Sequence, residues 1–195
     1  MISSDFEKLI NSFTKLPSVG MRSAERFAYS IISMKTEDAE NLAQNILNVK
    51  HNIKLCKICG NFTTNEICDI CSTRTSDVIC VVKEPKDIIN FEKIKNFNAL
   101  FHVLHGTLSP LKNITPNDLN INSLLNRIQE NNIQEVILAL GSDVEGEATS
   151  MYLAKLLKPL NIKVTRLAQG ISIGIELEYV DSVTLQRAFM DRREI

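Results

Sequence analysis

The chain has 195 residues, of which 44% are hydrophobic and 23% are charged, and its formal net charge is −1. This length predicts one or two globular domains whose cores need no covalent staples. The near-zero net charge excludes a global field that attracts nucleic acid, so any site for a polyanion must be local. No apolar run approaches the roughly 20 residues of a membrane span. The N-terminus lacks a signal-peptide pattern, and we therefore expect a cytoplasmic protein whose five cysteines stay reduced.

The first quarter of the chain carries only helical patterns. Apolar residues recur at helical spacing over 4–16, from about Ser23 onward, and over 37–49, and Pro17 and Gly20 separate the first two helices. The residues expected to face inward are Phe6, Leu9, Ile10, Phe13 and Leu16 in the first helix, Ala24, Phe27, Ala28, Ile31 and Ile32 in the second, and Ala39, Leu42, Ala43, Ile46 and Leu47 in the third.

The connection between the first two helices, LPSVGMRSAER (16–26), has the pattern of a hairpin that binds nucleic acid. Ser18 and Gly20 lie in its turn, where consecutive backbone N–H groups beside a helix N-terminus can face a phosphate. Arg22 and Arg26 lie one helical turn apart and would add charge contacts to the same strand. The pattern fits a plain helix–helix connection with solvated arginines equally well, because short motifs have false positives.

Four cysteines follow in polar, turn-rich sequence, with the spacing C-x2-C-x8-C-x2-C at Cys56, Cys59, Cys68 and Cys71. Each C-x2-C turn brings two sulfurs to one ion, and two such turns close a tetrahedral zinc site that leaves no position for water. In a reducing compartment this spacing predicts structural zinc rather than disulfides, with redox thiols or free core cysteines as alternatives. Cys80 lies in an apolar strand and is interpreted as a small buried hydrophobic residue.

From about residue 78 onward, apolar strands alternate with helical patterns. This alternation predicts a parallel sheet that is covered by helices. The predicted strands are 78–82, 99–104, 135–140 and 162–167. The predicted helices are 85–94, 147–157 and a last one at about 181–190. A further helix is predicted after the connection 105–116, and its inward-facing residues are Leu119, Leu124, Leu125 and Ile128.

The turn GSDVEGEATS (141–150) comes between a strand and a helix and carries Asp143, Glu145 and Glu147. Gly141 and Gly146 have the spacing of a phosphate-binding loop, but Glu147 stands where such a loop needs lysine, which excludes a P-loop. A magnesium site remains open at this point, because α/β sheets bind ligands at the carboxyl ends of their strands and Mg²⁺ binds carboxylates.

Several motifs occur in an order that resembles the RecR family of bacterial recombination mediators. They are LPSVGMRSAERFA, the four cysteines, ICVVKEPKDI, HVLHGTLSPL, GSDVEGEATSMYLAKLLKPL and VTRLAQGISIGIELEYVDSVTLQRA, and they cover nearly the whole chain. The resemblance implies an α+β multi-module fold with a helix–hairpin–helix domain (1–52), a zinc module (53–76), a Toprim domain (77–167) and a C-terminal assembly segment (168–195).

The resemblance also implies a function without turnover chemistry. RecR-like proteins form ring-shaped dimers or tetramers that encircle or clamp DNA. With RecO, and in some settings RecF, they help RecA replace single-strand-binding protein. By this resemblance the zinc ligands are the four clustered cysteines, and Arg22 and Arg26 contact DNA.

The sequence departs from the family and from catalytic Toprim domains at three positions. Ser18 replaces the first glycine of the hairpin, although only glycine adopts a positive φ without steric cost. Catalytic Toprim enzymes carry a glutamate after the first strand and a D-x-D pair after the third, where this chain has Lys83 and Gly141.

These losses argue against metal-assisted phosphoryl transfer. Lys83 is expected to neutralise the acidic turn, whose acids Asp143, Glu145 and Glu147 are then expected to dock a basic partner, which the resemblance implies is RecO. The alternative is a Mg-dependent Toprim nuclease or topoisomerase-like enzyme that uses the same three acids. Of the neighbouring pair His102 and His105, one is expected to be packed and one exposed.

Overall fold

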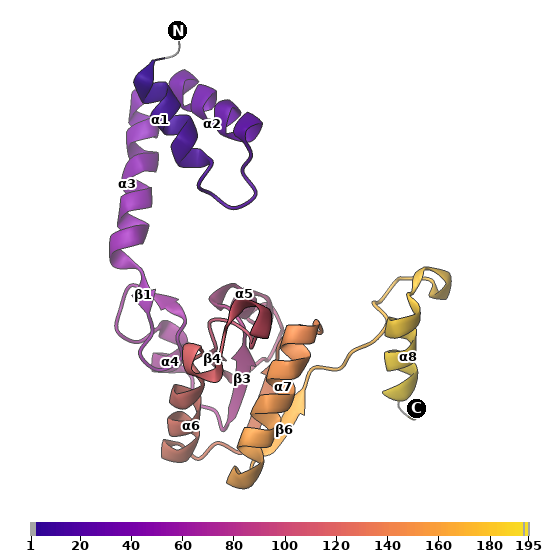
Figure 1. Cartoon of the computed structure of the whole chain (residues 1–195). Coiled ribbons are helices and arrows are strands. Elements are labelled where there is room, and N and C mark those ends of the chain that lie inside the picture. Colours follow the sequence, from indigo (N-terminus) through magenta and orange to yellow (C-terminus); the bar gives the residue numbers. More distant parts are fainter. Residues whose placement is uncertain (1–2, 193, 195) are drawn as a thin grey trace. The chain divides into compact units, whose positions relative to one another are not determined.

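The computed structural model describes residues 3–192 and 194, and the chain divides into two compact units, Met1–Ile53 and Lys54–Ile195 (Figure 1). They are called the helical unit and the sheet unit below. No helix within the described residues is both long enough and apolar enough to cross a membrane.

The helical unit is built on close packing between its first two helices. Ala24 and Ala28 are fully buried and, with Ile10, form the centre of this small core. Two aromatic pairs flank it, Phe6 with Tyr29 at 4.9 Å and Phe13 with Phe27 at 5.6 Å between ring centroids. The helices are α1 (Ser4–Phe13), α2 (Met21–Ser33) and α3 (Thr36–Asn52).

The prediction that the third helix buries an apolar face is wrong. Leu42, Ile46 and Leu47 are 41%, 60% and 49% exposed, and no residue of α3 is buried. Periodicity identifies an apolar face, but it does not say whether the same chain covers that face. Three other residues expected inward are also exposed, namely Leu16, which lies beyond the end of α1, Phe27 and Ile32.

The turn between α1 and α2 accommodates serine in a left-handed conformation. Ser18 has φ 64°, the region in which glycine is free of steric cost. The Val19 N–H donates to the Leu16 carbonyl at 3.2 Å, and Gly20 is the N-cap residue of α2. The hairpin therefore keeps a glycine-type backbone although a non-glycine residue stands at this position.

A series of substitutions at Ser18 tests whether its left-handed backbone conformation is strained. The left-handed region costs a non-glycine residue about 1 to 2 kcal/mol, least for asparagine and most for β-branched residues. Because Ser18 is exposed, substitutions there change backbone strain without removing packing. We expect urea denaturation to rank Ser18→Gly and Ser18→Asn at or above the wild type and Ser18→Val about 1 kcal/mol or more below it. Equal stability of the valine and glycine variants would contradict the strained turn.

The sheet unit begins with a small module around the cysteines, residues 54–73, called the cysteine module below. In it β1 (Lys54–Leu55) pairs antiparallel with β2 (Phe62–Thr63), and α4 (Asp69–Thr73) follows. The strands that come next form a parallel sheet in the order β4-β3-β5-β6. They are β3 (Val78–Val82), β4 (Leu100–Val103), β5 (Glu135–Ala139) and β6 (Lys163–Arg166).

Helices cover both faces of this sheet, as predicted. Ile79 and Val81 of β3 belong to one core cluster, and Cys80 and Val82, which point to the opposite face, belong to another. A central parallel strand is buried on both faces and therefore reads as a continuous apolar run. The helical elements are α5 (Pro85–Phe91), two 3-10 turns (Pro110–Lys112 and Pro116–Asp118), α6 (Ile121–Glu130), α7 (Val144–Leu157) and a 3-10 turn (Lys158–Leu160).

Two helix starts differ from the prediction. The α7 helix begins at Val144 rather than at residue 147, because the Asp143 carboxylate accepts the Gly146 N–H at 2.7 Å and caps the helix. Leu119 is buried as predicted, but it precedes α6. After β6, the C-terminal segment contains a 3-10 turn (Leu177–Tyr179) and the predicted last helix, α8 (Ser182–Met190).

Candidate functional sites

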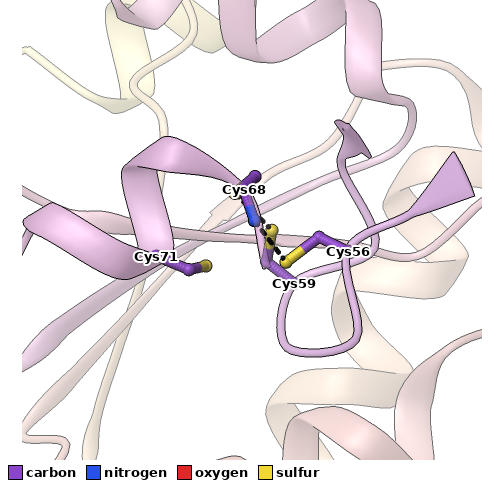
Figure 2. Close-up of side chains that lie close together, drawn as sticks. All are labelled: Cys56, Cys59, Cys68 and Cys71. Atoms are coloured by element: carbon purple, nitrogen blue, oxygen red, sulfur yellow. Dashed lines mark hydrogen bonds between the residues drawn. The ribbon is translucent and has the colours of Figure 1, made fainter. Parts of the chain in front are cut away.

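The four cysteines of the cysteine module converge on one point (Figure 2). Cys56 and Cys59 lie in the turn after β1, Cys68 is the N-cap residue of α4, and Cys71 lies within that helix. Their Sγ atoms all lie within 4.8 Å of one another. Zinc with four thiolates at about 2.3 Å holds the sulfurs roughly 3.8 Å apart, so the arrangement suits tetrahedral zinc.

Backbone N–H groups lie close to two of the sulfurs, and at Cys56 they favour the thiolate form. The Cys68 N–H lies 3.3 Å from Cys56 Sγ, and the Asn61 N–H lies 3.4 Å from Cys59 Sγ. Burial tends to raise the pKa of the Cys56 thiol, but the backbone hydrogen bonds that it accepts lower this pKa to about 7. The thiolate is the form that binds metal, so the local backbone prepares this ligand for zinc.

The cysteine module also covers one edge of the sheet. β4 is an edge strand, and the outward N–H and C=O groups of such a strand have no partner strand. The Val103 N–H donates to the Cys59 carbonyl at 2.8 Å, and Asn120 Nδ2 donates to the Val103 carbonyl at 3.1 Å. The turn that holds two of the cysteines is therefore fixed directly to the sheet.

Two arginines complete the cover of this edge. Arg127 Nη1 donates to the Phe101 carbonyl at 2.6 Å, and Arg74 Nη1 donates to the Ala99 carbonyl at 2.9 Å. Arg74 also forms a bidentate pair with Glu92, at 2.9 and 2.8 Å. These side chains satisfy backbone groups that would otherwise be open to another strand.

In the helical unit, the predicted DNA-contacting residues lie on the first turns of α2. Arg22 and Arg26 are both exposed, and within the described part of the chain neither takes part in an ion pair. The first N–H groups of α2, beyond the Gly20 N-cap, have no intrahelical partner. The hairpin thus presents free N–H groups and two uncompensated guanidinium groups from one short segment, which is the combination that binds phosphate.

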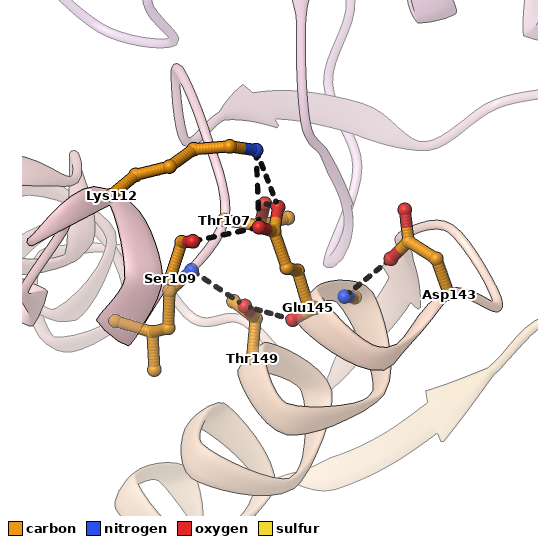
Figure 3. A network of polar contacts seen from close by, with 8 residues as sticks. Thr107, Ser109, Lys112, Asp143, Glu145 and Thr149 are labelled. Atoms are coloured by element: carbon orange, nitrogen blue, oxygen red, sulfur yellow. Dashed lines mark hydrogen bonds and ion pairs between the residues drawn. The ribbon is translucent and has the colours of Figure 1, made fainter.

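The acids of the acidic turn (141–150) do not face one ion. Glu145 accepts hydrogen bonds from Ser109 at 2.7 Å and from Thr107 at 3.1 Å, and Lys112 Nζ lies 3.1 Å from it (Figure 3). The Ser109 hydroxyl, then Lys112 and Thr107, lower the pKa of Glu145 to about 2. Glu145 therefore fastens the connection 105–116 to the start of α7.

Glu147 holds a different segment. Its carboxylate accepts from Gln169 Nε2 at 2.7 Å and forms ion pairs with Arg166 at 3.0 Å and with Arg187 at 3.6 Å. The Gln169 hydrogen bond and these two cations lower the pKa of Glu147. Arg187 lies in α8, so Glu147 ties the C-terminal segment to α7.

The cations that neutralise the turn differ from the prediction. Lys83 is predicted to neutralise the acidic turn, but it forms no ion pair with any residue that the structure describes. It lines a hollow together with Gly141 and Asp143. The neutralising cations are Lys112, Arg166 and Arg187, which sequence reasoning missed. The segment HGTLSPLK (105–112) is the one part of the sequence that could have indicated the partners of Glu145, because it carries two hydroxyl side chains and a lysine.

Among the described residues, the four cysteines are the one group of metal-type ligands that comes together. Asp143 is exposed, and one of its oxygens caps α7, while Glu145 and Glu147 are engaged elsewhere. The two histidines behave as expected. His102 is buried, with Nε2 2.7 Å from the Asn120 carbonyl, and burial lowers its pKa to about 4, whereas His105 is exposed. Cys80 is fully buried, and burial raises its pKa to about 12.

Four family models match the chain in consecutive segments. A model described as RecR, helix-hairpin-helix matches residues 6–50, and the model of the RecR zinc finger domain with four cysteines matches 53–73. The Toprim domain model matches 77–168, and RecR, C-terminal matches 170–193. The predicted α+β multi-module fold class is thereby confirmed, and the zinc finger match with the four converging sulfurs identifies zinc as the cofactor.

Proposed function

The chain belongs to the RecR family, and on that premise we propose that it clamps DNA and acts with RecO to load RecA onto gaps coated with single-strand-binding protein. It is a DNA-binding, zinc-containing protein of DNA repair and recombination with a mediator role. The observation that carries the proposal is the hairpin, where free helix N–H groups and unpaired Arg22 and Arg26 lie within one matched helix–hairpin–helix segment.

We assign four parts to the chain for this role: the DNA-binding helices over 1–52, the zinc module over 53–76, the Toprim domain over 77–167 and the assembly segment over 168–195. Cys56, Cys59, Cys68 and Cys71 are the proposed zinc ligands, supported by their converging sulfurs. Ser18, Gly20, Arg22 and Arg26 are the proposed DNA contacts. The setting is the cytoplasm, where the thiols stay reduced.

We propose that the chain acts as a homodimer or homotetramer, with RecF as a further partner beside RecO. Exposed apolar side chains on α3 and in the C-terminal segment support assembly, because a single copy leaves them in water. The protein works without catalysing a reaction in this proposal. An Mg-dependent nuclease or topoisomerase needs carboxylates that converge on the metal. Glu145 instead binds the connection 105–116, and Glu147 binds the C-terminal segment.

Replacing both Arg22 and Arg26 with alanine tests the DNA interface. Each phosphate contact contributes about 0.7 to 0.9 to the slope of log affinity against log salt, so the double variant should lose roughly 1.4 to 1.8 of that slope. Affinity should fall about tenfold or more at physiological salt, and thermal stability should hold because both side chains are exposed. Fluorescence anisotropy with a labelled oligonucleotide across a salt series measures both quantities.

The matched control replaces Lys35 and Lys50 of the same helical unit with alanine. It also removes two positive charges, but from exposed positions outside the hairpin. DNA binding by this control should stay close to the wild type. If the two double variants weaken DNA binding equally, net charge rather than the hairpin governs the interaction.

Asp143 is the proposed docking acid for RecO, with Glu145 and Glu147 holding the acidic turn in shape. Asp143 and the 86% exposed Val144 lie on the surface at the start of α7, where one Asp143 oxygen caps the helix. Asp143→Asn should keep the cap, because asparagine caps as well as aspartate, but it removes the charge. We expect weaker RecO association, mainly through a slower on-rate at low salt, with DNA binding retained.

Asp118→Asn is the control for that experiment, since Asp118 is also an exposed capping acid, bonded to Thr115 at 2.8 Å, and lies outside the turn. Surface plasmon resonance with immobilised RecO separates the two variants. Unchanged RecO kinetics for Asp143→Asn would move the docking site away from the acidic turn.

A further inference from the structure

A polar cavity lies between the cysteine module and the sheet, and it shares no residue with the acidic turn. Its volume is about 630 Å³, within the range of small-ligand sites. Its lining includes Lys57 and Cys71 from the cysteine module, Arg74 from the connection to β3, and Asn126, Arg127 and Glu130 from α6.

Arg127 is the unusual member of this lining. It is only 7% exposed, and a buried charge is costly unless an opposite charge or several hydrogen bonds compensate it. Among the described residues, the one hydrogen-bond partner of its side chain is the Phe101 carbonyl, a neutral group. Arg74, by contrast, is paired with Glu92, and Arg166 and Arg187 are paired with Glu147.

The rest of the lining favours an anion. Lys57, Arg74 and Arg127 carry positive charge, Glu130, which is exposed, is the one carboxylate, and Cys71 is a proposed zinc ligand. Lys57 is paired with Glu66 and Arg74 with Glu92, so Arg127 is the one cation of the lining that forms no ion pair with a described carboxylate. The lining also includes side chains with hydroxyl or amide donors, namely Thr75, Ser76, Ser123, Asn126 and Asn131.

We propose that this cavity binds a phosphate group, with Arg127 as the charged anchor. The planar guanidinium fork matches phosphate oxygens, and one edge of it stays available after Nη1 has bonded to Phe101. A tetrahedral phosphate offers acceptor oxygens in several directions, which suits donors arranged around it better than a planar carboxylate does. The phosphate belongs either to a small soluble compound or to a nucleic-acid backbone.

Equilibrium dialysis of the zinc-loaded full chain against labelled inorganic phosphate tests the site. Asn126→Asp adds a negative charge to the lining from an exposed position, and we expect it to weaken phosphate binding about tenfold or more. Gln129→Glu is the matched control, because it adds the same charge to the same helix at an exposed residue outside the lining, and it should change binding less than about twofold. Arg127→Lys, which keeps the charge but loses the fork, should weaken binding as well.

Saturable binding that is lost in Asn126→Asp and kept in Gln129→Glu supports the proposal. Absence of saturable binding to the wild type at millimolar phosphate, or equal weakening by the two acidic variants, overturns it. A short single-stranded oligonucleotide is then added to the bound wild type. Displacement of the labelled phosphate by the oligonucleotide identifies the nucleic-acid backbone as the source, and retention identifies a small phosphate compound.

Discussion

Replacing Gly146 with alanine should destabilise the sheet unit by about 3 kcal/mol or more, a loss at the upper end of those for single substitutions. An added Cβ would lie 2.1 Å from the Gly141 carbonyl oxygen and 2.8 Å from its carbonyl carbon. Both atoms belong to the backbone, so no side-chain rotation relieves the clash. The end of β5 and the first turn of α7 would have to separate, and the hydrogen bond from the Gly146 N–H to Asp143 would be lost with them.

Gly141→Ala is the control for this prediction in the same turn. The nearest atoms to a Cβ at Gly141 are those of the Asp143 carboxylate at 3.7 Å, an ordinary contact, so its effect should stay within about 0.5 kcal/mol. Chemical denaturation of the two variants measures the difference. If Gly146→Ala matches Gly141→Ala in stability, the close approach of the two backbones does not hold the turn.

This close approach also explains a pattern that the sequence left ambiguous. Gly141 and Gly146 have the spacing of a phosphate loop, and the lysine position argued against that function without giving the glycines another one. In the structure, the second glycine lets the start of a helix pass against the carbonyl of the first. A glycine pair marks a backbone constraint, but the sequence does not say whether a ligand or another part of the chain comes close.

The parallel sheet and the metal cluster followed from the sequence because both depend on local spacing. The run VICVV reads as buried on both faces, and β3 has core clusters on both sides. Two C-x2-C turns bring four sulfurs together almost regardless of what surrounds them. Such features survive in any tertiary context that keeps the chain folded.

The roles of the acids could not be read in the same way. Glu145 and Glu147 are two residues apart, yet one binds Lys112 and the other binds Arg166 and Arg187. Those partners lie 19 to 40 residues away in the chain, and only the tertiary arrangement of the connection 105–116, β6 and the C-terminal segment brings them close to α7. Likewise, the sequence shows that α3 has an apolar face. It does not show that this face stays exposed, because that depends on which other elements of the chain pack against the helix.

Loss of zinc should unfold the cysteine module while leaving the two core clusters of the sheet in place. Structural zinc contributes about 10 kcal/mol or more to the folding of small modules, and the small core of this module consists of its cysteines with the partly buried Ile58 and Ile70. Cys59→Ser should lower the zinc content from about one ion per chain to a small fraction of that, as measured by atomic absorption. Limited proteolysis should then cut within residues 54–73, which the wild type protects.

The consequence extends to the sheet, because Cys59 is both a proposed ligand and the residue whose carbonyl accepts the Val103 N–H. Without a folded module the outer edge of β4 opens, and an open edge pairs with other chains, so the variant should also aggregate faster on warming. Cys80→Ala controls for cysteine loss as such. It removes a buried thiol from the core but should keep the zinc and the resistance of 54–73 to protease. A Cys59→Ser protein with full zinc content, or with an uncut module, would mean that the edge is held by Arg74, Arg127 and Asn120 without help from the metal.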